Sequence, residues 1–149
     1  MAVAVFALYA SGADGAPKTL DAATRAHLAA ERFSEVRQVA RLPAAVREEL
    51  ARRLSGGIAD AGQPFQETDV VREPGLPRHR LVVAAVSGDH CIVHYESGGI
   101  ALFRTVVIVS LQDGKAAIQW EGAARGGLTT VAEIQAALRD GSLFRTQGR

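Results

Sequence analysis

The chain of 149 residues is 48% apolar and 22% charged, with a formal net charge of +1. Its length fits one domain with a single sizeable core, and its balance of apolar and charged residues does not predict intrinsic disorder. The small net charge gives no long-range attraction to nucleic acid. The single cysteine, Cys91, excludes an internal disulfide and a four-cysteine zinc site.

The first fifteen residues contain an unbroken apolar run from Ala2 to Ala10. This run is much shorter than the roughly 20 residues that a membrane-spanning helix requires, so it predicts no membrane span. Its length fits the apolar core of a signal peptide, although no Lys or Arg precedes it. Two interpretations stay open for residues 1–15: a signal-derived segment, or a first strand packed in the domain.

Two helices are predicted in the next part of the chain. An alanine-rich segment with apolar residues at helical spacing begins at Thr19, which is a suitable cap. Leu42 precedes a proline, which disfavours helical geometry and marks a break. Pro43 suits the first position of a second helix, which the Gly56–Gly57 pair ends. The apolar stripe of that second helix consists of Val46, Leu50 and Leu54.

The segment 58–79 is rich in proline and glycine and has no sustained hydrophobic period, which predicts a long structured loop. Loops of this length are often functional, and the alternative is a structural loop that wraps an edge of the sheet. Three apolar residues are expected to pin it to the body of the domain: Phe65, Val70 and Val71. Glutamates lie among the arginines here and in the second helix, with few aromatic residues, so no nucleic-acid interface is predicted.

Residues 80–122 are the most regular part of the chain. Four β-like segments, RLVVAAVS, HCIVHYE, IALFRTVVIVSL and KAAIQWEG, are joined by short turn signals and predict an antiparallel meander. A two-residue turn is expected at Gly88–Asp89 and a three-residue turn at residues 97–99.

In the register that these turns give, Val82 faces Tyr95 and Trp120 faces Val107. One face of the sheet is then almost entirely apolar, and it includes Cys91. The other face carries polar side chains and is expected to be solvated.

A C-terminal helix over residues 129–140 is predicted from the capping-box pair Thr130 and Glu133, with Gly141 ending it. We therefore expect a single α+β domain over residues 1–149. A four-stranded antiparallel β-meander would be packed with two N-terminal helices and one C-terminal helix, and the helices would cover the face from Val82 to Trp120.

The polar face of the predicted sheet carries the residues that best suit a site. His94 and Glu96 lie two apart on one strand and point to one face, and His79 extends the preceding strand onto that face. These three residues are candidate ligand-binding residues. His90 and His94 lie about 13 Å apart along a strand, so they cannot share a metal ion. We expect no metal, no cofactor and no tight zinc binding at His94.

Signals for catalysis are absent from the sequence. Cys91 is expected to be an inert packing residue, because a buried thiol lacks the stabilised thiolate that reactivity requires. The chain has no GxSxG motif, phosphate-binding loop or GxGxxG fingerprint, so no catalytic residues are identified.

Three stretches of sequence carry a resemblance: IADAGQPFQETDVV, LPRHRLVVAAVSGDHCIVHYESGGIA and the W-E-G ending of the fourth strand. Together they cover roughly the middle half of the chain. They resemble a group of small bacterial proteins that share an HYE-GGIA strand motif, have no assigned activity and in several cases carry export signals. The resemblance implies a bacterial source and a periplasmic or cell-envelope location, with a cytoplasmic location as the alternative. It implies no catalytic residues.

Taken together, these patterns favour a non-enzymatic binding or protein-interaction module whose partner is an unidentified protein or small molecule. The oligomeric state stays open. The alternative is a small hydrolase or metal-dependent enzyme that uses the face of His79, His94 and Glu96. The two hypotheses differ in whether these side chains converge in a concave pocket.

Overall fold

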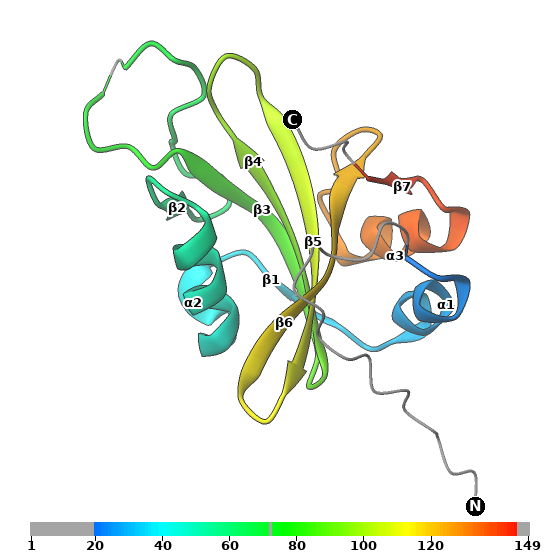
Figure 1. Cartoon of the computed structure of the whole chain (residues 1–149). Coiled ribbons are helices and arrows are strands. Elements are labelled where there is room, and N and C mark those ends of the chain that lie inside the picture. Colours follow the sequence, from blue (N-terminus) through cyan, green and yellow to red (C-terminus); the bar gives the residue numbers. More distant parts are fainter. Residues whose placement is uncertain (1–19, 72, 146–149) are drawn as a thin grey trace, which may run out of the picture.

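The computed structural model describes residues 20–71 and 73–145, which form three layers with an antiparallel sheet between helices (Figure 1). The helices are α1 (Ala22–Ala30), α2 (Ala44–Arg53) and α3 (Val131–Asp140), with a short 3-10 helix at Val39–Arg41. The strands are β1 (Ser34–Val36), β2 (Ile58–Ala59), β3 (His79–Val86), β4 (His90–Ser97), β5 (Phe103–Gln112), β6 (Lys115–Ala124) and β7 (Leu143–Phe144). The predictions for residues 1–15 lie outside the described residues.

All three predicted helices are present, and their ends follow from local hydrogen bonding. Asp21, rather than Thr19, caps α1, because its carboxylate accepts the backbone N–H of Thr24 at 2.9 Å. α3 has the predicted capping box, in which the Thr130 hydroxyl and the Glu133 carboxylate accept each other's backbone N–H groups. Gly141 ends α3 in the left-handed conformation, with φ 70°.

The four long strands β3 to β6 form the predicted antiparallel meander, but the sheet has seven strands rather than four. Its order is β1-β3-β4-β5-β6-β7, and β2 pairs in parallel with β3. The three additional strands are only two or three residues long, too short for the alternation that identifies a strand in a sequence. One of them, β2, begins the segment 58–79 that was expected to be loop throughout.

A β-bulge in β3 corrects the predicted register with β4. The pairing shifts between Leu81 and Val83, so that Leu81 and not Val82 faces Tyr95. An extra residue reverses the alternation of side chains along a strand. Residues of β3 that precede the bulge, including His79, therefore point to the opposite face from the one expected.

A second bulge, in β6, corrects the predicted register with β5. Ile118 pairs with Val109, but Trp120 pairs with Ile108 rather than with Val107. Trp120 is buried as predicted, at 2% exposure, but on the opposite face of the sheet. The expected three-residue turn after β4 is also longer, because Ser97 pairs with Phe103 and residues 98–102 form a loop between them.

Helices cover both faces of the sheet, whereas the sequence predicted helices on one face. In Figure 1, α2 lies on one side of the sheet and α1 with α3 on the other. The α2 side buries Leu42, Val46, Leu50, Leu81, Ala84, Cys91, Val93, Tyr95, Val107 and Val109. The α1/α3 side buries Leu28, Val83, Ala85, Ile92, Val106, Ile108, Trp120, Ala124, Leu128, Ile134, Ala137 and Leu138. The sheet face that was expected to be solvated is thus a second core.

No helix within the described ranges combines the length and apolarity needed to cross a membrane.

Candidate functional site

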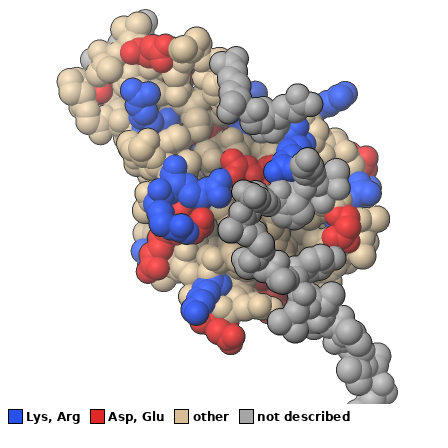
Figure 2. Space-filling model, viewed as in Figure 1, with Lys and Arg blue, Asp and Glu red and all other residues tan. Residues whose placement is uncertain are grey.

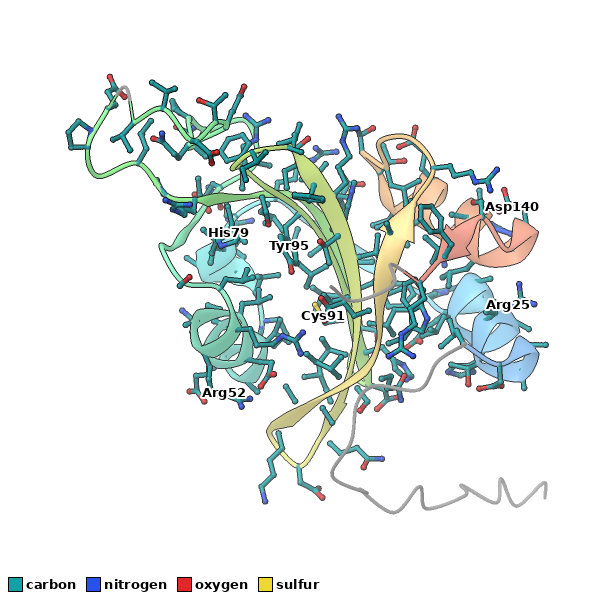
Figure 3. The ribbon with its side chains drawn as sticks, turned by 45° about the horizontal axis from the view of Figure 1, so that its top comes forward. Arg25, Arg52, His79, Cys91, Tyr95 and Asp140 are labelled. Atoms are coloured by element: carbon teal, nitrogen blue, oxygen red, sulfur yellow. The ribbon has the colours of Figure 1, made fainter. Side chains whose placement is uncertain are left out.

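The three sequence-predicted site residues do not converge. His79 lies on the α2 side of the sheet, where its ring meets that of Tyr95 edge-on with centroids 6.0 Å apart (Figure 3). His94 and Glu96 point to the α1/α3 side. The bulge in β3 is the physical reason, because it moves His79 to the other face.

His79 has a structural role in joining segments. Its Nε2 donates to the Ser55 carbonyl oxygen at 3.0 Å, and its Nδ1 lies 2.7 Å from the Ser97 hydroxyl. Burial lowers its pKa, and the Ser55 carbonyl acts in the opposite direction. The ring therefore ties the turn after α2 to the end of β4.

Glu96 is the centre of a charged network rather than a free carboxylate. Arg80 donates to it at 2.7 Å, and Nε of Arg104 lies 3.4 Å from its other oxygen. The Arg80 guanidinium also stacks over the ring of Phe65, 4.3 Å from its centroid. This network anchors the start of the long loop 60–78 to β3 and β4.

His94 is fully buried under the segment that leads into α3. Its Nδ1 donates to the Leu128 carbonyl oxygen at 2.6 Å, and its Nε2 has no hydrogen-bond partner among the described residues. Burial lowers the pKa of His94 from its usual 6.5, and the Leu128 carbonyl raises it. A protonated Nε2 would be a buried donor without an acceptor, so the neutral ring fits this position.

Replacing His94 by Gln is expected to reduce the pH dependence of stability. Because the folded pKa is lowered, the unfolded chain binds a proton more readily, and stability is lost as the pH falls below about 6.5. Gln keeps an N–H for the Leu128 carbonyl but does not titrate. Urea midpoints should therefore fall less in H94Q than in the wild type between about pH 7.5 and pH 5.5. An equal fall in both proteins would contradict the conclusion that His94 is buried in its neutral form with a lowered pKa.

Cys91 is the packing residue that the sequence predicted. It is fully buried between the sheet and α2 (Figure 3), and burial raises the pKa of its thiol to about 12. The thiolate is therefore not formed near neutral pH, and the geometry gives Cys91 no role as a nucleophile.

A cluster that the sequence analysis missed lies where the C-terminal end of α1 meets the β3–β4 turn. Nδ1 of His90 lies 2.8 Å from Oε2 of Glu31, and Nε2 of His27 lies 3.7 Å from the same oxygen. Among the described residues, this is the one group of three such side chains whose ligand atoms all lie within 4.8 Å of one another. Part of this cluster could have been predicted from the sequence, because His27 and Glu31 are four residues apart, a spacing that places two side chains on one face of a helix.

A second feature that the sequence did not predict is an apolar surface at the end of the sheet that holds the β4–β5 loop. We call the apolar tip the five exposed residues Val70, Val71, Ile100, Leu102 and Phe103, with exposed fractions from 44% to 94%. Val70 and Val71 were expected to be buried, and residues 100–102 were expected to belong to a strand. Of the three apolar residues predicted to pin the long loop, Phe65 alone is buried.

The two segments of the apolar tip are joined by backbone contacts. Thr68 forms a parallel bridge with Gly99, and the Gly99 N–H donates to the Glu67 carbonyl at 3.3 Å. The buried Gln66 side chain donates to the carbonyls of Thr68 and Val70, at 3.1 and 2.8 Å. Beside them lies a cavity of about 440 Å³ lined by Phe65, Gln66, Glu67, Thr68, Val70, Glu73 and Leu76.

No protein-family model, curated protein or solved structure matches the chain. The resemblance to small exported bacterial proteins therefore stays a prediction, and the function rests on the geometry alone.

Proposed function

We propose that the chain is a non-enzymatic protein-interaction module that binds a segment of a partner protein at its apolar tip. One observation carries the proposal: five of the six exposed large apolar side chains in the described part of the chain belong to the tip. Single exposed apolar residues are common on soluble proteins, but five of them on two segments that are joined by backbone contacts indicate a site of interaction.

The tip is built to keep its shape. The long loop is held at its base by Gln66 N–H donating to the Pro77 carbonyl at 2.8 Å and by Gly98 N–H donating to the Arg78 carbonyl at 3.1 Å. The Glu96 network fixes Arg80 and, through it, Phe65. A surface that is already ordered loses less conformational entropy when a partner binds, which favours affinity.

Charge indicates the chemistry of the partner. Three exposed acidic residues, Glu67, Asp69 and Glu73, lie in the long loop beside the tip. None of them takes part in an ion pair within the described residues. Figure 2 shows acidic residues at the top of the lobe that this loop forms at the upper left, with basic residues below them. The segment that fits is therefore one with apolar side chains flanked by Lys or Arg.

The enzyme hypothesis has less support. It required His79, His94 and Glu96 to converge in a concave pocket, and these side chains lie on two faces of the sheet. Each of them already has a structural partner.

The proposal is tested by selecting peptides from a random phage library on the full chain, and then measuring the affinity of a synthetic peptide that the selection enriches. We expect apolar sequences with flanking Lys or Arg. The double variant Ile100→Ser, Phe103→Ser should bind that peptide with an affinity lower by about tenfold or more, because the apolar contact is lost. The matched control is Phe144→Ser, which removes an exposed apolar side chain outside the tip and should leave the affinity unchanged.

Three results would contradict the proposal. One is enrichment of acidic peptides, and another is a peptide whose affinity is the same for the tip variant and the wild type. The third is a concentration-dependent dimer, seen by analytical ultracentrifugation, that disappears in the tip variant, because the tip would then bind a second copy of the chain.

A further inference from the structure

We infer that His27, Glu31 and His90 form a binding site for one divalent transition-metal ion of the zinc class. The site is independent of the apolar tip, and it runs against the expectation from the sequence that the protein holds no metal. Two imidazole nitrogens with one carboxylate oxygen are a donor set that zinc accepts, leaving a fourth position for water or another ligand.

The separations of the donor atoms fit one ion. For ligand bonds of about 2.0 to 2.1 Å, two donors of a tetrahedral zinc site lie about 3.4 Å apart. Here the Glu31 Oε2 atom lies 2.8 Å from His90 Nδ1 and 3.7 Å from His27 Nε2, and every donor pair is within 4.8 Å. The His27 side chain is 65% exposed, so its ring is free to adjust without repacking the core.

Two of the three proposed ligand atoms have unsatisfied hydrogen-bonding capacity, which also supports a bound ion. Glu31 Oε2 and His90 Nδ1 are both buried, yet neither has a hydrogen-bond partner of acceptable geometry among the described residues. Buried polar atoms are rarely left without a partner. An ion between them would accept a lone pair from each and satisfy both atoms.

The carboxylate is held by its other oxygen. The Ser87 hydroxyl donates to Glu31 Oε1 at 2.5 Å, and this leaves Oε2 to face the two rings. The same hydroxyl oxygen accepts the backbone N–H of His90 at 2.9 Å, so one residue positions two of the three donors. Hydrogen bonds of this kind orient the ligands of metal sites.

The backbone that carries the donors is also fixed. Gln135 of α3 donates to the Glu31 carbonyl oxygen at 2.8 Å, which ties the C-terminal end of α1 to α3. His27 belongs to α1, Glu31 is the residue that caps its C-terminal end, and His90 begins β4. A bound ion would therefore cross-link the first helix to the β3–β4 turn and stabilise the folded chain by mass action.

The test is calorimetry with Zn²⁺ on the full chain, stripped of metal and carrying no histidine tag. We expect one site per chain with micromolar or tighter affinity. His27→Gln, at an exposed position, should weaken binding at least tenfold, and Glu31→Gln should abolish it. His79→Gln is the matched control, because this histidine lies on the other side of the sheet, and it should bind as the wild type does.

A second readout separates a metal site from a folding defect. Zn²⁺ should raise the melting temperature of the wild type and of H79Q but not of E31Q, whose folding is checked by circular dichroism. Co²⁺ should give the visible absorption of a four-coordinate ion in the wild type and lose it in H27Q. Absence of a stoichiometric site, equal binding by H27Q and the wild type, or loss of binding in H79Q would each overturn the inference.

Discussion

Replacing Trp120 by Ala is expected to destabilise the domain by about 3 to 5 kcal/mol, as large-to-small aromatic changes in protein cores do. Trp120 is 2% exposed and belongs to the core between the sheet and α1 with α3. Its ring lies against Gly122, where an added Cβ would come within 2.5 Å of Cζ2. The ring and the glycine fill one space, so the alanine side chain would leave a cavity that the backbone cannot close.

Urea unfolding followed by far-UV circular dichroism measures this loss. Phe144→Ala is the matched control, because Phe144 is an aromatic residue of the neighbouring strand that is 44% exposed, and it should cost less than about 1 kcal/mol. A loss below about 1 kcal/mol for Trp120→Ala as well would mean that the bulge in β6 does not place the ring in the core.

Gly98→Ala is the second change from which we expect a large effect. A Cβ at position 98 would overlap the backbone of the long loop, at 2.7 Å from the carbonyl carbon of Gln66 and 2.8 Å from that of Glu67. Backbone cannot move aside as a flexible side chain can, so the loop must separate from the β4–β5 loop. We expect a loss of about 1 to 3 kcal/mol, the range found for overpacked cores.

The control for the steric overlap in G98A is Gly88→Ala in the β3–β4 turn. Gly88 has nothing within 4 Å of an added Cβ, so the same chemical change meets open space there. G98A should also weaken the selected peptide, because the two halves of the apolar tip are no longer held together, whereas G88A should not. Equal stability and equal peptide affinity in the two variants would show that the contact between the loops is unimportant.

The sequence predicted the helices and long strands of this fold better than it predicted the side of the sheet to which their side chains point. The helices could be found because their ends depend on hydrogen bonds between residues close in the sequence, as with Thr130 and Glu133 at the start of α3 and Gly141 at its end. The meander could be found from alternation and turn signals. The two bulges could not, because a single extra residue in β3 or β6 leaves no mark in composition, yet it moves His79 and Trp120 to the opposite side of the sheet.

The candidate sites were beyond the sequence for a different reason. His90 meets His27 and Glu31 only because the fold brings the C-terminal end of α1 to the β3–β4 turn, and long-range contacts of this kind have no local pattern. Ile100 and Phe103 follow a glycine pair and continue into a β-like run, so their apolar character suggested a strand. Their exposure follows from the contact between the β4–β5 loop and the long loop, which depends on tertiary structure.

The placement of β1 and β2 bears on solubility at high concentration. The two strands share the outer edge of β3, where β1 pairs with residues 84–86 and β2 with residues 79 and 80. An uncovered edge offers N–H and C=O groups on which other chains can add and aggregate. At the opposite edge of the sheet, β7 pairs with Ala123 and Ala124, and the free part of β6 begins with Lys115, whose charge opposes such addition. These short pairings reduce the length of free edge that the sheet presents beside its exposed apolar tip.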